Sequence, residues 1–184
     1  MTEKEKMLRG EIYNANYDKE LLAERALCKE LCYDYNNLRP SQTTEREVLL
    51  RKLLGRCGEV FTIEPSIWFD YGYNITIGEN FYSNHNLVIL DGAPVTFGDN
   101  VFIAPNCGFY TATHPLDAAQ RNEGLEYAKP ITIGNNVWIG GGVTVLPGVT
   151  IGDNCVIGAG SVVVKSIPAN SVAIGNPCKV HKNL

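Results

Sequence analysis

The chain has 184 residues, of which 45% are apolar and 20% charged, a composition typical of one globular domain with a small appendage. Its net charge of −4 argues against a nucleic-acid-binding protein, which would carry a basic surface. No apolar run is long enough to span a membrane, and the charged N-terminus lacks the apolar core of an export signal, so we expect a cytoplasmic protein without membrane partners.

Residues 1–57 form the first part of the chain, and their pattern predicts two helices. The stretch DKELLAERALCKELCYDYNN spaces its leucines as a helix face does, and Pro40 cannot continue that helix. The stretch TTEREVLLRKLLG predicts a second helix, in which Thr44 and Glu47 match a capping box and Gly55 is placed to end it. We expect this helical hairpin to pack on the rest of the protein through its apolar faces.

Residues 58–184 form the second part, which is built on a six-residue repeat. Apolar residues recur six positions apart, except for a jump of eight at Gly92-Ala93-Pro94 and a gap after Cys107. Another apolar series runs two positions after the first. The first series consists of Ile75, Phe81, Leu87, Val95, Val101, Cys107, Ile131, Val137, Val143, Val149 and Cys155. The second series consists of Ile77, Phe97, Ile103, Ile133, Ile139, Val145, Ile151, Ile157 and Val163. Self-similarity at a fixed period indicates a stacked repeat architecture.

The repeat predicts a parallel β-helix, so we expect a mainly β protein. Residues i and i+2 of a strand point to one face, so each apolar pair forms a short strand with an inner side. Bends such as IGDN and IGNN follow, because Gly, Asn and Asp tolerate the left-handed backbone of a sharp corner. Such units coil with three flat faces per turn. A β-sandwich fits less well, because its strands recur every 8–12 residues.

The repeat stops over residues 111–130, a polar stretch that contains Pro115 and Pro130. We expect this stretch to leave the coil as one protruding loop and to form the wall of a groove, where functional groups concentrate. His114 lies near its start, and a histidine exchanges protons near neutral pH. Cys107 precedes the loop but belongs to the inward series, so we expect a buried and unreactive thiol.

The repeat through NPCKV, together with YGYN, TATHP and the N-terminal helices, resembles the hexapeptide-repeat acyltransferases of the maltose and galactoside O-acetyltransferase type. The resemblance covers nearly the whole chain. It implies a left-handed β-helix, a homotrimer with active sites between subunits, acetyl-CoA as co-substrate and a sugar hydroxyl as acceptor. It also implies that His114 is the general base. A thioester already has a good leaving group, so we expect direct transfer without an acyl-enzyme, and triad-like logic makes Glu126 a candidate to orient the imidazole.

The same resemblance assigns binding roles. The residues expected at CoA are Trp138, Gly141, Ala159, Val164, Lys165, Lys179 and Lys182. The residues expected at the acceptor are Asp18, Arg25, Asp70, Asn84 and Asp91. Gly141 would offer a backbone N–H to the developing oxyanion, and Trp138 should point outward from its coil. Lys179 and Lys182 stand where arginine is frequent in the family, and lysine binds phosphate as a point charge.

Several alternatives stay open at this level. The acceptor is either a sugar such as maltose or glucose, which the Asp70 stretch DYGYN favours, or a galactoside or another small hydroxylated molecule, including a serine or an antibiotic. A carbonic-anhydrase-like zinc enzyme of the same fold needs three histidines, but His85, His114 and His181 lie far apart in the repeat, so we expect no metal. A non-catalytic scaffold is the remaining class. The six cysteines lack a CxxC pair and are expected to be reduced.

Overall fold

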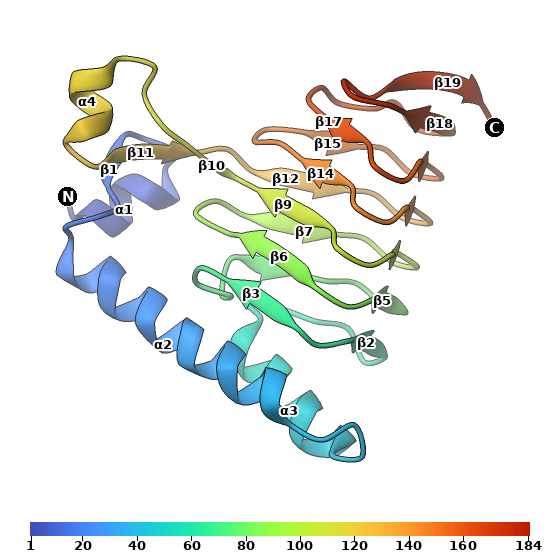
Figure 1. The fold of residues 1–184 in the computed structure, drawn as a ribbon, viewed down its shortest axis with the longest axis horizontal. Helices are drawn as coiled ribbons and strands as arrows, with labels where there is room; N and C mark the ends of the chain where they lie inside the picture. Colours follow the sequence, from blue (N-terminus) through green and yellow to red (C-terminus); the bar gives the residue numbers. More distant parts are fainter.

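Short strands wind into a stack of coils in the computed structural model, which describes residues 1–184 (Figure 1). Each coil contributes strands to three parallel sheets, which we name the first, second and third faces in the order in which a coil visits them. The first face contains β4 (Ile75–Thr76), β7 (Val95–Phe97), β12 (Ile131–Ile133) and β15 (Thr150–Ile151). The third contains β3 (Ile67–Phe69), β6 (Leu87–Leu90), β9 (Gly108–Tyr110), β14 (Thr144–Val145) and β17 (Val162–Val163). The predicted parallel β-helix is confirmed.

The second face is the longest of the three and ends in an antiparallel strand. Its parallel strands are β2 (Phe61–Ile63), β5 (Phe81–Ser83), β8 (Phe102–Ile103), β13 (Trp138–Ile139), β16 (Val156–Ile157) and β18 (Ser171–Ile174). Strand β19 (Lys179–Asn183) then turns back along β18 and forms the final edge of this sheet. The edge strand carries Lys179 and Lys182, and charged side chains discourage pairing with another chain.

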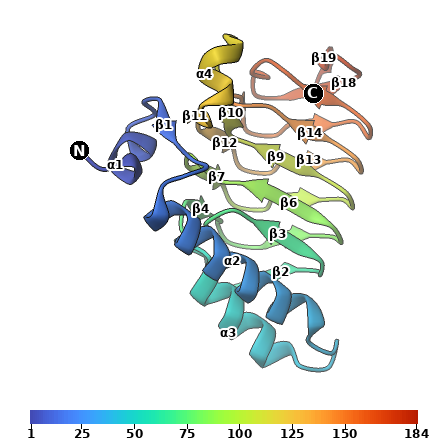
Figure 2. The ribbon, with the colours of Figure 1, turned by 60° about the vertical axis from the view of Figure 1, so that its left-hand side comes forward.

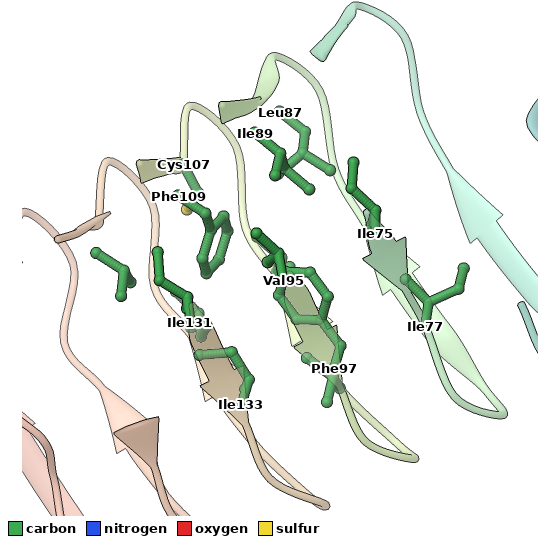
Figure 3. Packing of buried hydrophobic residues seen from close by; sticks show 14 of the residues in the cluster. Ile75, Ile77, Leu87, Ile89, Val95, Phe97, Cys107, Phe109, Ile131 and Ile133 are labelled. Carbon is green, nitrogen blue, oxygen red and sulfur yellow. The ribbon is translucent and has the colours of Figure 1, made fainter. Parts of the chain in front are cut away.

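Both apolar series point into the coil, where they form one continuous core (Figure 3). Every residue of the two series is 3% exposed or less. Phe81 of one coil packs against Phe97 of the next, and Phe97 packs against Phe109 of its own coil. Their ring centroids are 5.2 Å and 5.0 Å apart, in the edge-to-face arrangement that aromatic rings prefer. Burial of each such side chain contributes about 1.5–3 kcal/mol, so each added coil supports its neighbours.

An asparagine ladder stabilises the corner between the first and second faces. Its members are Asn80, Asn100, Asn136, Asn154 and Asn170, each with φ between 53° and 59°. The Nδ2 group of each donates to the Oδ1 atom of the next, over distances of 2.8–3.2 Å. Asparagine adopts the left-handed backbone more readily than other non-glycine residues, and the ladder adds side-chain bonds that glycine could not make.

Four helices accompany the coils: α1 (Glu3–Leu8), α2 (Lys19–Asn37), α3 (Thr43–Leu53) and α4 (Ala118–Asn122). Helices α2 and α3 lie side by side at the N-terminal end of the stack (Figure 2). Helix α2 contributes Cys28, Cys32 and Tyr35 to the core, and α3 contributes Leu50 and Leu53. No helix combines the length and the apolar character needed to cross a bilayer.

The predicted ends of the helices need correction. Helix α3 begins at Thr43, and neither Thr44 nor the preceding Gln42 caps it through a side chain. Glu47 bonds Arg51 one turn later, at 2.8 Å, instead of closing a capping box. Gly55 is no left-handed stop: a Cβ there would collide with the carbonyl oxygen of Tyr73, so glycine permits a close backbone approach.

Helix α1 was not predicted, although its sequence carried the signal. The Thr2 hydroxyl accepts from the Glu5 N–H, and the Glu5 carboxylate accepts from the Thr2 N–H, which makes a complete capping box. The strand that follows α1, β1 (Tyr13–Asn14), was equally unforeseen. A two-residue strand shows no periodicity, so only its pairing partner defines it.

The excursion over residues 111–130 has secondary structure of its own. It leaves the third face through β10 (Ala112–Thr113), forms α4, and returns through β11 (Leu125–Ala128). Strand β11 pairs antiparallel with β10 on one side and with β1 on the other. The excursion therefore projects from the coils beside the N-terminal segment, as Figure 1 shows for α4, β11 and β1.

Candidate active site

His114 lies directly after β10, and its exposed imidazole makes one hydrogen bond inside the excursion. The Nδ1 atom is 3.2 Å from the carbonyl oxygen of Leu125 on β11. A carbonyl oxygen only accepts, so this bond requires the proton on Nδ1 and leaves Nε2 with its lone pair. Nε2 is thus the atom that can take a proton from a substrate.

Glu126 does not hold the imidazole. Its carboxylate accepts a hydrogen bond from the hydroxyl of Tyr13, which is fully buried on β1. The partner of His114 is the backbone of the preceding residue, Leu125. Side-chain types carry no information about which backbone carbonyl faces a ring, so the sequence offered no signal for this contact.

Arg25, Asp70, Tyr71 and Asp91 meet where the third face turns toward the first. Asp91 is fully buried, and its Oδ1 accepts from the backbone N–H groups of Asp70 at 3.1 Å and Tyr71 at 2.9 Å. Arg25 donates to the Tyr71 hydroxyl at 2.9 Å and to the carbonyl of Ala15. Asp91 therefore shapes the turn that carries Asp70, whose own side chain stays partly exposed.

Burial controls the protonation of both carboxyls. Desolvation raises the pKa of Asp91 to about 6, although bonds from backbone N–H groups oppose the shift. The Oδ2 atom of Asp91 has no partner, which fits a carboxyl that holds a proton more readily than usual. Desolvation also raises the pKa of Asp70, against the opposing charge of Arg25.

Two of the residues expected at the acceptor have local structural roles. Asp18 is the N-cap of α2, and its Oδ1 accepts from the Leu21 N–H at 3.0 Å. Asn84 lies at the corner between the second and third faces, where its Oδ1 accepts from the His85 N–H at 2.7 Å. In one chain Asn84 is therefore on a different corner from Asp70 and His114.

At the corner between the second and third faces, asparagine is replaced by glycine in the coils toward the C-terminal end. Asn86 and Asn106 occupy the left-handed position in the lower coils, and Gly142 and Gly160 occupy it above them. A Cβ on Gly160 would meet no atom within 4 Å. This upper part, residues 140–142 and 158–160, is named here the glycine corner. Gly142, Ala159 and Gly160 are exposed in it, whereas Gly140 is buried.

Two free backbone donors lie at the glycine corner. The N–H groups of Gly141 and Ala159 donate to no protein acceptor, whereas the neighbouring Gly140 and Gly142 both bond the stack. Free N–H groups on a surface with few side chains suit a ligand that offers carbonyl oxygens or a developing negative charge. Trp138 stands beside this corner on β13, 58% exposed, and points outward as its position in the repeat predicts.

The lysines expected at CoA lie at the C-terminal end of the stack; they are Lys165, Lys179 and Lys182. None of them lies within ion-pair distance of a carboxylate. Lys182 stands opposite Val172, which continues the outward column of Trp138 and Val156 on the second face. With strands about 4.8 Å apart, Lys182 is about 14 Å along this column from Trp138. Lys165, and Val164 before it, follow β17 at the far end of the third face.

The outward sides of the faces differ in character. On the first face they form a column of threonines, Thr76, Thr96, Thr132 and Thr150. On the second face they form a column of large residues, Tyr82, Phe102, Trp138 and Val156. Exposed aromatic columns of this kind mark surfaces that bind a ligand or another protein, whereas the threonine face suits water.

The cysteines and histidines occupy separate positions along the fold. All six cysteines are free, and Cys107 is 2% exposed, with burial raising the pKa of its thiol. No three His, Cys, Asp or Glu side chains converge on one point. His85 bonds the carbonyl of Pro65, and His181 lies on the edge strand β19.

Two family models match the chain. Residues 6–58 match the maltose acetyltransferase hexapeptide capping motif, and residues 130–165 match the bacterial transferase hexapeptide of six repeats. The first match covers the helices at the N-terminal end of the stack, and the second covers coils that include Trp138 and the glycine corner.

The similarity to known proteins in sequence and in structure extends over nearly the whole chain. A Saccharomyces cerevisiae protein with a provisional acetyltransferase name is 58% identical over 180 residues, 98% of this chain and 92% of its own length. A maltose O-acetyltransferase from Clostridium difficile 630 superposes with a TM-score of 0.98 at 54% identity, covering 100% of this chain and 98% of that one. A galactoside acetyltransferase in complex with coenzyme A gives 0.95 at 46% identity, covering 100% and 91%.

Proposed function

The chain belongs to the hexapeptide-repeat acetyltransferases of the maltose and galactoside O-acetyltransferase type, and we propose that it transfers the acetyl group of acetyl-CoA to a hydroxyl of a sugar such as maltose or glucose. The observation that carries this proposal is the bond between His114 Nδ1 and the Leu125 carbonyl, which leaves Nε2 as a proton acceptor on an exposed imidazole. Histidine in this state is a general base.

The proposed reaction is a direct transfer. His114 Nε2 takes the proton of the sugar hydroxyl while that oxygen forms a bond to the acetyl carbonyl carbon. The carbon–sulfur bond of the thioester then breaks, and the imidazolium returns the proton to the leaving thiolate. The Gly141 N–H, which has no protein acceptor, would stabilise the negative charge on the carbonyl oxygen.

The glycine corner fits the expected CoA site. Its exposed backbone and the free N–H of Ala159 suit an extended arm that carries amide groups, and Trp138 offers an apolar wall. Lys165, Lys179 and Lys182 are exposed cations without carboxylate partners, which suits the phosphates of CoA. The galactoside acetyltransferase that this chain resembles was solved with coenzyme A, which supports the choice of co-substrate.

The proposed active site lies between subunits of a homotrimer. His114 and Asp70 belong to the edge between the third and first faces, whereas Gly141, Ala159 and Asn84 belong to the corner between the second and third faces. The third face separates the two sets within one chain, so a neighbouring copy has to bring them together. The aromatic column of the second face, unlike the threonine column of the first, provides the apolar surface for such packing.

On the acceptor side, Asp70 and Arg25 are proposed to bind sugar hydroxyls, with Asp18 and Asn84 contributing from the cap of α2 and from the neighbouring subunit. Asp91, which is fully buried, would act by holding the backbone of Asp70 and Tyr71. A site built from carboxylates favours neutral polyols that donate hydrogen bonds. A galactoside is the alternative acceptor, favoured by the similarity to the galactoside acetyltransferase.

The test is thiol release from acetyl-CoA, measured against a panel of glucosides, galactosides, serine and water. Wild type should release thiol with one sugar class only, and His114→Ala should reduce turnover by at least about 100-fold while CoA binding is kept. His114→Asn is the matched control for loop structure, because its Nδ2 group can still donate to the Leu125 carbonyl but it cannot act as a base. Wild-type-like turnover in His114→Asn would refute the assignment, and absence of both CoA binding and thiol release would favour the scaffold.

A further inference from the structure

We propose that the N-terminal segment, residues 2–17, is a positioning element for the catalytic histidine. It acts through strand β1, which holds β11 in the place where the Leu125 carbonyl fixes the His114 ring. The inference rests on the proposed function of His114 as base, and it assigns a positioning role to a segment that pairs with the excursion through β1.

The register of the strands gives the first argument. Asn14 stands directly opposite Leu125, and Tyr13 stands opposite Glu126. Strand β10 pairs only with the C-terminal half of β11, through Tyr127 and Ala128. Leu125 therefore has a strand partner on the β1 side alone, and without β1 its carbonyl would belong to the loose end of a two-stranded hairpin.

Side chains add two bonds at the residues next to Leu125. The Tyr13 hydroxyl donates to the Glu126 carboxylate, and Asn16 Nδ2 donates to the Gly124 carbonyl at 3.3 Å. Gly124 has a φ of 78°, and a Cβ on it would come within 2.8 Å of the Tyr17 ring. The N-terminal segment thus contacts the positions before, at and after the carbonyl that orients the histidine.

The segment is itself firmly attached to the body of the protein. Arg25 of helix α2 donates to the Ala15 carbonyl, which joins the segment to that helix. Within the segment, the backbone N–H of Asn14 donates to Glu3 of helix α1 at 2.5 Å. Met7, Tyr13, Ala15, Leu21 and Tyr71 form a second buried cluster, apart from the core of the coils. Because Tyr71 belongs to the turn that carries Asp70, the same cluster joins the acceptor side to the strand that holds β11.

Loss of this support should change the state of the imidazole. If β11 is free to shift, the Leu125 carbonyl no longer holds the proton on Nδ1, and the ring can rotate or take the tautomer with the proton on Nε2. That tautomer cannot accept a proton from the sugar through Nε2. The expected defect is a lower turnover with an unchanged affinity for acetyl-CoA, because the glycine corner lies on another edge of the fold.

The first test is Tyr13→Phe, which keeps the buried ring and removes the bond to Glu126. We expect kcat to fall about three- to tenfold, with the KM for acetyl-CoA within about twofold of wild type. The ring-nitrogen shifts of His114 in ¹⁵N-histidine-labelled protein should change from one tautomer to a mixture. The chain has only three histidines, so the His114 signals can be assigned with His114→Asn.

The matched control is Tyr35→Phe. Tyr35 is also buried and also donates one hydrogen bond through its hydroxyl, to the carbonyl of Ile63 on β2, the first strand of the stack. Tyr35→Phe should lower the free energy of unfolding by about as much as Tyr13→Phe does, and it should leave both kcat and the tautomer of His114 unchanged. Glu126→Gln, which keeps an acceptor for Tyr13, should retain more activity than Glu126→Ala.

Asn16→Ala tests the same idea at an exposed side chain if Tyr13→Phe does not fold. Wild-type kcat and a single Nδ1–H tautomer in the folded Tyr13→Phe or Asn16→Ala protein would overturn the proposal. The tautomer measurement needs no turnover, so it tests the positioning role even if the wild-type protein acetylates no sugar, and the two proposals can fail separately.

Discussion

The imidazole of His114 is bonded to the carbonyl of Leu125, eleven residues further along the chain, so this side chain joins the two strands of the excursion. The bond determines which ring nitrogen of the neutral imidazole carries the proton. The excursion starts on the edge between the third and first faces, whereas the free N–H groups of Gly141 and Ala159 lie on another corner. These two facts lead to the first prediction.

Mixed oligomers should recover activity from two inactive variants. His114→Ala lacks the base, and Ala159→Trp should block the glycine corner with an exposed bulky side chain. If each site combines one chain's excursion with the neighbour's corner, a randomly mixed 1:1 assembly should regain about a quarter of wild-type turnover. Thiol release is measured after the two proteins are unfolded and refolded together. Activity no higher than that of the separate variants would argue that the site is formed within one chain.

The asparagine ladder predicts an unusual order of stability at one position. Asn136 accepts from Asn100 and donates to Asn154, at a φ of 56°. Asn136→Gly loses the bonds but keeps an allowed backbone, whereas Asn136→Ala loses the bonds and adds strain of about 1 kcal/mol. The free energy of unfolding, from urea titration, should decrease in the order wild type, Gly, Ala. Equal values for Gly and Ala would show that the backbone strain is absent.

Asp91 predicts part of the pH dependence of stability. Its pKa in the folded protein is about 6, above its ordinary value of 3.8, so the folded state binds this proton more tightly than the unfolded state does. The contribution of Asp91 therefore becomes more favourable as the pH falls from 7 to 4, by about 3 kcal/mol at most.

Asp91→Asn should remove that contribution, because its Oδ1 can still accept from Asp70 and Tyr71 but it does not titrate. The measurement is the free energy of unfolding at pH 7.5 and pH 4.5 for both proteins. The free energy of unfolding of the variant should decrease relative to that of wild type as the pH falls. A difference between the two proteins that is constant with pH would contradict a raised pKa for Asp91.

Lys182 predicts the effect of charge on co-substrate affinity. Lys182→Ala should raise the KM for acetyl-CoA about three- to tenfold with little change in kcat, because the phosphates of CoA lie far from the reacting carbonyl. Lys182→Arg should lower the same KM, since a guanidinium contacts phosphate through two bonds. The effect of Lys182→Ala should shrink at high salt. A variant that changes kcat and leaves KM alone would exclude the phosphate role.

Local chemistry made most of the fold predictable. The six-residue period placed both apolar series inside the coil, and it placed Trp138 outside, because side-chain direction alternates along a strand. Of the Gly, Asn and Asp residues that IGDN and IGNN offer for the left-handed corner, only the final Asn adopts that backbone, whereas the glycine permits a close approach of the next coil. The positions of α2 and α3 were predicted, but both ends of α3 were predicted wrongly. At its start Glu47 bonds Arg51 instead of closing a capping box, and after its end Gly55 permits a close approach of the Tyr73 carbonyl from another part of the chain.

For the candidate site too, some features were predictable from the sequence and others only from the structure. His114 stood out chiefly because TATHP resembles the acetyltransferases, since a lone histidine in a loop is ordinarily a solvated surface residue. The sequence by itself determined the coil and the position of that interruption, since both depend on spacing along the chain. Only the tertiary structure decided that Leu125 holds the ring, that β1 supports β11, and that the glycine corner lies away from the histidine, because each depends on which distant backbone groups become neighbours once the coils stack.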